Sequence, residues 1–190
     1  MTPGFTKPKI PAPSHSPDIG NGGAASLPKM LTTRRLVLRP FALSDLGAYI
    51  AYYTGPRTAG VGGPKPRHVV AERFHAMAGQ WALRGFGRYA IALNDVAIGH
   101  VGVLKIDDPD QHEMTWSLWD AVNEGKGYAF EAAHVVLRAW SGPNLVAQID
   151  RDNLASIRLA ERLGFVEDAG APKPALMPNA RTFRGPEALR

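Results

Sequence analysis

Hydrophobic and polar positions follow two periods along the chain, which predicts a domain built from both helices and strands. Apolar residues at helical spacing predict four helices, at 46–53, 67–84, 129–140 and 153–163. The helix over 129–140 is apolar on nearly every face, so it is expected to be buried. Alternating and β-branched runs predict six strands, at 31–41, 89–93, 96–106, 112–119, 145–149 and 181–184. Asn94 and Asp95 have the composition of a two-residue hairpin turn.

The stretch between the strand at 112–119 and the next helix is the most informative part of the chain. It places Gly125, Lys126 and Gly127 directly at a helix start. Glycine leaves the backbone N–H groups uncovered, and the first N–H groups of a helix have no partner within the helix. Because the helix dipole also favours negative charge there, a phosphate-bearing cofactor fits this position. A tight turn ahead of a buried helix is the structural alternative.

The N-terminal segment and the loop after the first helix have compositions of their own. Residues 1–29 are rich in Pro, Gly, Ser and Ala without periodicity, which predicts a disordered tail with Met30 as an alternative start. Residues 30–190 are long enough for one domain. The Gly- and Pro-rich stretch at 57–66 is expected to form a flexible lid, because no strand precedes its glycines.

Composition excludes several classes of site. The chain has 190 residues, a net charge of +5 and no cysteine, so disulfides, thiolate metal sites and cysteine nucleophiles are absent. The histidines show no pair at ligand spacing with carboxylates, and no metal is expected. The mild positive charge suits a phosphorylated ligand. Lys and Arg form no patch interleaved with aromatic residues, so nucleic acid ranks last among the partners.

A twin-arginine pattern and the lack of long apolar runs bear on location. No stretch of about 18 apolar residues exists, so no membrane-spanning helix is expected. Residues 33–38 resemble a twin-arginine export signal, but Pro40, Ser44 and Asp45 interrupt the apolar stretch that should follow. We therefore expect a cytoplasmic protein, and a homodimer is left open.

Three motifs, in order, resemble the GNAT superfamily of N-acetyltransferases. The segment 125–132 looks like the cofactor motif of that superfamily. The pattern Asn153-x-x-Ser156-x-x-Leu159 with the ending at 162–165 is similar to its second signature block. The start at 33–40 resembles the first strand of the branch named for ribosomal-protein N-acetyltransferases. The likeness covers residues 31–165, most of the expected domain.

The resemblance implies a fold, a donor and a set of contacts. The fold is the acyl-CoA N-acyltransferase fold, a three-layer α+β arrangement in which helices flank a mixed, mostly antiparallel sheet with splayed central strands. Acetyl-CoA would enter the splay as the cosubstrate. Its pyrophosphate would rest on N–H groups of Gly125, Lys126, Gly127, Tyr128 and Ala129. Its pantetheine arm would lie along the strand at 112–119 and near Asn153, whose other role is to cap a helix.

The implied reaction moves an acetyl group from a thioester to an amine. A backbone N–H near Leu118 or Trp119 would stabilise the oxyanion, given a bulge in that strand as in the family. Glu113 is the leading candidate for the general base, against the alternative of a solvated strand-end carboxylate. Asp120 is a second candidate, with turn capping as its other role. Ser156 would approach the leaving thiolate, or else serve only in the helix cap.

This sequence departs from the family pattern in three places. Ala160 stands near the position where many relatives have a tyrosine acid, so Ser156 or water must protonate the thiolate. Gln148 lies where some relatives have glutamate, and Val122 replaces the Gln or Arg that often opens the glycine motif. The first reading is an acetyl-CoA-dependent N-acetyltransferase that acts on a primary amine. The alternative is a CoA-binding sensor or interaction module without catalysis.

Overall fold

The protein is described here by a computed structural model that covers residues 25–106, 111–172, 174 and 177–186. Its strands form one mixed sheet in the order β1-β2-β3-β4-β5-β6-β8-β7. Neighbouring strands are antiparallel except for β5 and β6, which are parallel. The strands are β1 (Leu31–Thr32), β2 (Val37–Arg39), β3 (Arg88–Leu93), β4 (Val96–Leu104), β5 (His112–Leu118), β6 (Leu145–Asp150), β7 (Val166–Glu167) and β8 (Ala180–Arg184).

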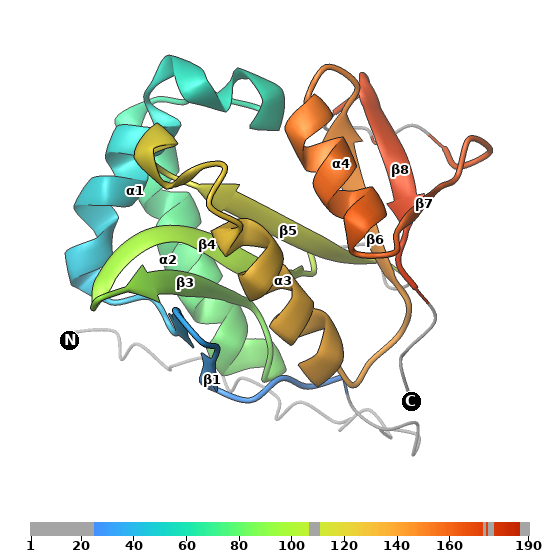
Figure 1. Cartoon of the computed structure of the whole chain (residues 1–190). Helices are drawn as coiled ribbons and strands as arrows, with labels where there is room; N and C mark the ends of the chain where they lie inside the picture. The colour runs from blue at the N-terminus through green and yellow to red at the C-terminus, as the bar shows by residue number, and fades with distance from the viewer. Residues whose placement is uncertain (1–24, 107–110, 173, 175–176, 187–190) are drawn as a thin grey trace, which may run out of the picture.

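Helices cover both faces of this sheet (Figure 1). One face carries α1 (Leu46–Tyr53) and α2 (Arg67–Arg84), and the other carries α3 (Tyr128–Ala139) and α4 (Leu154–Arg162). Three short 3-10 turns complete the described elements: η1 (Leu43–Asp45), η2 (Pro56–Val61) and η3 (Ala121–Asn123). The arrangement confirms the three-layer α+β fold. No helix within the described ranges is long and apolar enough to cross a membrane.

The two parallel strands at the centre separate soon after they begin. Their register holds only two pairs, His112 with Leu145 and Glu113 with Val146. Beyond these pairs β5 and β6 diverge, as Figure 1 shows, and their far ends lead to the starts of α3 and α4. The expected splay is therefore confirmed, with its vertex at Glu113.

Two apolar clusters hold the layers together. The larger one packs Ala132, Ala133 and Val136 of α3 and Ile157 of α4 against the sheet. The smaller one joins α1 and α2 through Tyr49, Phe74 and other aromatic residues to Trp119. Burial of apolar surface is the main stabilising contribution to such a core.

Several elements differ from the sequence prediction. The first strand is broken into β1 and β2, because Thr33 and Leu36 close a turn through a 2.9 Å backbone hydrogen bond. The α3 helix is buried along one face only, since His134 and Arg138 are exposed. The stretch at 57–66 begins with η2 and is not wholly irregular. The short strand β7 was not predicted.

The ends of the domain and the regularity of β5 also differ from expectation. Leu27, which the sequence assigns to the tail, is buried in the core, and Pro28 accepts a hydrogen bond from the hydroxyl of Tyr89. The ordered domain therefore includes residues 25–29, while residues 1–24 lie outside the described part of the chain. The pairing of β5 with β4 is regular, so the bulge predicted for β5 is wrong. The irregularity lies one strand away, between β3 and β4 at Ile91 and Ala92.

Candidate functional site

The start of α3 presents free backbone N–H groups, as its glycines predict. Gly125 and Gly127 have φ of +70° and +80°, a left-handed conformation that side chains other than glycine adopt only with strain. The first helical hydrogen bond runs from the Glu131 amide to the Gly127 carbonyl at 3.0 Å. The amides of Tyr128, Ala129 and Phe130 precede that bond, so they have no partner within the helix. They form a site suited to an anion.

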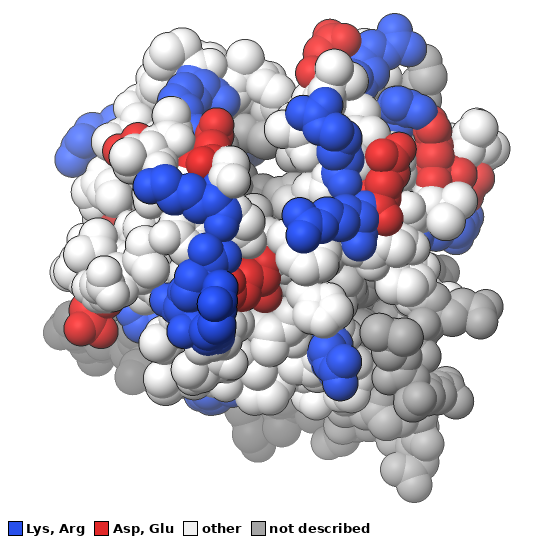
Figure 2. All heavy atoms as spheres, viewed as in Figure 1, with Lys and Arg blue, Asp and Glu red and all other residues white. Residues whose placement is uncertain are grey.

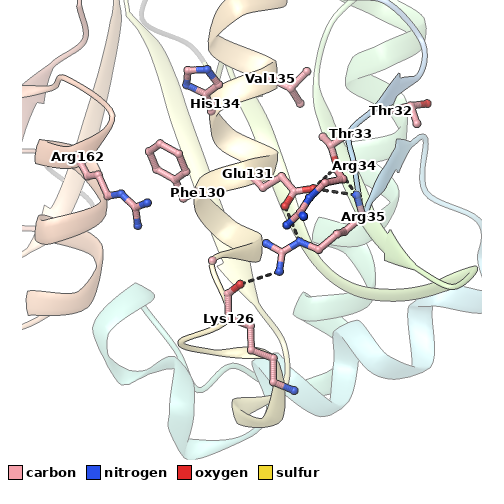
Figure 3. Close-up of a pocket in the computed structure, with 11 residues that line it drawn as sticks. Thr32, Thr33, Arg34, Arg35, Lys126, Phe130, Glu131, His134, Val135 and Arg162 are labelled. Carbon is pink, nitrogen blue, oxygen red and sulfur yellow. Dashed lines mark hydrogen bonds and ion pairs between the residues drawn. The ribbon is translucent and has the colours of Figure 1, made fainter.

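Arg35 fixes the direction of the peptide at this helix start. Its NH1 donates to the carbonyl of Lys126 at 3.0 Å, and its Nε donates to Oε2 of Glu131 at 2.7 Å (Figure 3). Because C=O and N–H point in opposite directions across a trans peptide, holding the Lys126 carbonyl turns the Gly127 N–H away from Arg35. The arginine thus acts as a latch on the anion site.

Glu131 completes this latch from the first turn of α3. Its Oε1 accepts from the hydroxyl of Thr33 at 2.6 Å and from the backbone amide of Arg35 at 3.0 Å. Burial by itself would raise the pKa of Glu131, but the hydrogen bonds from Thr33 and Arg35 outweigh it and lower that pKa. The carboxylate therefore stays ionised and ties the β1–β2 turn to the helix.

A basic pocket of about 570 Å³ lies beside the same helix start. Arg34, Arg35, Lys126 and Arg162 are among the residues that line it (Figure 3). Arg162 reaches across from α4 and stacks over the ring of Phe130 at 4.1 Å. Figure 2 shows this face hollowed between the two halves of the molecule, with basic side chains on both rims. The charge and the free amides both favour a phosphorylated ligand.

Antiparallel pairing decides which amides of β5 face the splay. The Trp119 amide donates to the carbonyl of Ile98 on β4 at 2.8 Å. Since hydrogen-bonding direction alternates along a strand, the amides of Leu118 and Trp116 point the other way, toward β6. Trp119 also gives its carbonyl to Arg57 and its indole N–H to His100. The polar groups of Trp119 are therefore already hydrogen-bonded. Of the two predicted backbone donors to the oxyanion, this leaves Leu118.

The start of α4 forms the opposite wall of the splay. Oδ1 of Asn153 accepts from the Ser156 amide at 3.1 Å, so Asn153 caps the helix. Within the described residues, no hydrogen bond uses its side-chain NH2, which stays available to a ligand. The hydroxyl of Ser156 accepts from the indole N–H of Trp116 at 3.2 Å, so an indole bridges β5 and α4. Ala160 is fully buried in the core and faces no cleft.

Glu113 lies at the vertex of the splay, on the sheet face that α1 and α2 cover. It is half-buried, and burial raises its pKa to about 7. The nearby charge of Arg88 and a hydrogen bond from the Gln148 backbone amide act in the opposite direction but do not cancel this effect. A carboxyl group with a pKa near neutrality is suited to proton transfer. Asp120, by contrast, is exposed and caps the η3 turn at the Val122 amide.

His100 lies on the same sheet face as Glu113, opposite Ser117 of β5, but is not available as a base. It is 2% exposed, and its Nδ1 accepts from the indole of Trp119 at 3.0 Å. Burial and the charge of Arg88 together hold its pKa well below the ordinary value. The imidazole is therefore neutral, and the nitrogen that would take a proton is already used.

Sequence reasoning missed the residues that act through long-range contacts. Arg35 and Glu131 are 96 positions apart, and nothing in either segment indicates their pairing. Arg88 gave a weak signal, as the one charged residue in an otherwise apolar strand. Among the described residues, no group of three or more His, Cys, Asp or Glu side chains is placed to hold a metal ion.

Comparison with known proteins shows which family the chain resembles. Residues 35–166 match the family model described as the acetyltransferase (GNAT) domain. The acetyltransferase from Agrobacterium tumefaciens str. C58 has a TM-score of 0.75 and 32% identity, with 85% of this chain and 96% of that chain covered. A protein from Bordetella pertussis assigned to the GnaT family has a TM-score of 0.66 and 25% identity, over 83% and 98% of the two chains.

A more distant neighbour shows the same fold. RimL, a ribosomal L7/L12 alpha-N-protein acetyltransferase in complex with coenzyme A, has a TM-score of 0.66 and 17% identity. The match covers 82% of this chain and 96% of that one. No curated protein sequence matches the chain.

Proposed function

Because the chain belongs to the GNAT acetyltransferase family, we propose that it transfers an acetyl group from acetyl-CoA to a primary amine. The observation that carries this proposal is the splay between β5 and β6, which leads from the free amides of α3 to Glu113. Coenzyme A bound to RimL, a protein of the same fold, supports the identity of the donor.

The donor would contact residues on three elements. The amides at 127–130 would bind the pyrophosphate, and Lys126 and Arg162 would lie near the remaining phosphate. The side-chain NH2 of Asn153 would donate to the pantetheine arm, while its Oδ1 keeps the helix cap. The amide of Leu118 would donate to the thioester oxygen, where negative charge develops during attack.

Glu113 would serve as the general base. The amine nitrogen attacks the thioester carbonyl carbon, a C–N bond forms, and the C–S bond breaks. Glu113 takes the proton that the amine releases by way of water, since Leu118 and Glu113 lie at opposite ends of β5. The thiolate leaves with its electron pair and takes a proton from water or from Ser156. The oxygen of Ser156 already accepts from Trp116, so its own proton remains free to be donated.

A cytoplasmic site of action is part of the proposal. To act as an export signal, the twin-arginine pattern would have to lie in an extended segment. In the folded protein, Arg35 of that pair is instead bound to Glu131 and to the Lys126 carbonyl. The pattern therefore has a structural role in this chain.

One observation favours a second function, a CoA-binding module without catalysis. Ala160 occupies the position where a tyrosine acid was expected, and it is buried. Calorimetry with acetyl-CoA, followed by thiol release with a panel of amines, separates the two readings. Binding with turnover supports the transferase, and binding without turnover of any amine supports the module. A protein that does not bind acetyl-CoA contradicts both.

A further inference from the structure

We propose that the acceptor is a small molecule with a carboxylate next to its amine, as in a free amino acid, and that Arg88 binds this carboxylate. The amine would then face Glu113. The inference rests on the proposed function, because it names the acceptor of the same reaction.

The strand register places Arg88 and Glu113 on one face of the sheet. Arg88 pairs with Gly102 on β4, and Gly102 pairs with Thr115 on β5. Residues paired across strands point to the same face, and so do residues two apart on one strand. Glu113 is two positions from Thr115, so it shares the face of Arg88. Gly102 has φ of +146°, and a Cβ there would stand 2.4 Å from the Gly87 carbonyl oxygen, so β4 places no side chain between Arg88 and Glu113.

Arg88 has no anionic partner in the folded protein. Its Nε is buried and makes no hydrogen bond. The ion pairs found among the described residues do not include Arg88, so Glu113 lies near it but outside direct contact. A guanidinium with a buried, unpaired Nε is costly, and a carboxylate held by two parallel hydrogen bonds satisfies it best.

Apart from Glu113, the neighbours of Arg88 carry no negative charge. Tyr49 and Tyr53 from α1 approach it, and both are buried and neutral because burial raises their pKa. Arg73 from α2 adds a second positive charge nearby. Among the described residues, Glu113 is the carboxylate whose charge acts on Arg88. The site thus offers positive charge on one side and a proton acceptor on the other.

The η2 turn connects the two walls of the splay at its open end. Arg57 donates to the Trp119 carbonyl at 2.7 Å and pairs with Glu124, which ties η2 to the end of β5. At the other end of η2, Gly60 lies beside Asn153, where an added Cβ would stand 3.6 Å from that side chain. The turn therefore bridges the end of β5 and the start of α4, at the open end of the splay and away from its vertex at Glu113 (Figure 1).

The two charges also discriminate between classes of amine. In a free amino acid, the carboxylate carbon is two bonds from the amine nitrogen. One molecule can therefore place its carboxylate at Arg88 and its amine toward Glu113. In a protein N-terminus, the corresponding carbonyl is a neutral amide and cannot replace the missing anion. An enzyme discriminates strongly against a substrate analogue that leaves buried polar groups of the site unpaired.

The test compares matched acceptors in a thiol-release assay with acetyl-CoA. The probes are the free amino acids, their amides, and a short peptide with a free N-terminus. For the amino acids that are turned over, kcat/KM is expected to exceed that of the matching amide by about 100-fold or more. Equal or faster turnover of the amides, or of the peptide, overturns the proposal.

Variants test the role of Arg88 itself. Arg88→Gln should lower the ratio of kcat/KM for acid over amide by at least about tenfold, and Arg88→Lys should restore part of it. Arg67→Gln removes an exposed arginine at the start of α2 and should leave the ratio unchanged. If Arg88→Gln does not fold, Arg88→Lys must still show a higher KM for the acid. An unchanged ratio in a folded Arg88 variant overturns the assignment.

Failure of this inference is separable from failure of the proposed function. Acetyl-CoA binding with turnover of carboxylate-free amines alone would keep the transferase and contradict the acceptor class. If no amine is turned over, calorimetry with N-acetyl amino acids and their amides, on protein loaded with CoA, decides the question. Tighter binding of the acids supports the role of Arg88, and equal binding contradicts it.

Discussion

The unusual pKa of Glu113 has a consequence for stability that needs no substrate. An ordinary glutamate has a pKa of 4.5, and burial raises that of Glu113 to about 7 in the folded protein. The folded state therefore holds this proton more tightly than the unfolded state does. As pH rises from 4.5 to 7, the unfolded chain releases the proton first, so the free energy of unfolding falls.

The size of the effect follows from the two pKa values. At 1.36 kcal/mol for each pH unit, the difference corresponds to about 3 kcal/mol, and partial solvent access reduces this toward about 2 kcal/mol. Glu113→Gln keeps the shape and removes the ionisation. We expect the variant to gain about 2–3 kcal/mol relative to the parent between pH 5 and pH 8.

Urea denaturation of both proteins at pH 5, 6, 7 and 8 measures this difference. Glu72→Gln, which changes an exposed carboxylate on α2, serves as the matched control and should run parallel to the parent at every pH. If the free energy of unfolding of Glu113→Gln also changes with pH in parallel with that of the parent, Glu113 has an ordinary pKa. The same result would remove the physical basis for its role as a base near neutrality.

Three further predictions concern catalysis and the donor site. The pH profile of kcat/KM should rise with an apparent pKa near 7, since Glu113 must be ionised to accept a proton, and Glu113→Gln should abolish that rise. Gly127→Ala should weaken acetyl-CoA binding about tenfold by calorimetry, because φ of +80° costs about 1–2 kcal/mol for alanine, whereas Gly79→Ala on α2 should leave affinity unchanged. Arg35→Gln should raise the Kd for acetyl-CoA about five- to tenfold by releasing the Lys126 carbonyl, and equal affinity for Arg35→Gln and Arg67→Gln would contradict the latch.

The sequence predicted the parts of the fold that depend on local signals. The α2 helix was placed at its observed bounds, because Gly85 ends it in a left-handed conformation. The hairpin at Asn94 and Asp95 was also predicted, and both residues have positive φ. The break between β1 and β2 was missed, since Arg34 and Arg35 lie within a run that otherwise alternates like a strand. Their turn is held by Glu131, and periodicity carries no information about so distant a residue.

The candidate site also has contacts that the sequence predicts and contacts that it does not. Contacts made by backbone groups, such as those after Gly127, require glycine or a cap residue at a given position, and these leave a local mark in the sequence. Contacts made by side chains from separate elements do not. The role of Arg88 depends on a glycine in β4, a carboxylate in β5 and two tyrosines in α1. Only the folded sheet brings these four segments together.

This difference explains why the donor is easier to identify than the acceptor. Acetyl-CoA would be held largely by amides whose direction depends on backbone conformation, so any sequence that keeps the positive φ of Gly125 and Gly127 keeps the site. The acceptor would be chosen on the other sheet face, where α1, α2 and η2 supply side chains. Substitution there changes charge and size without disturbing the splay. Arg88 is the charged residue on which the proposed choice of acceptor depends, and its buried, unpaired Nε is the observation behind that proposal.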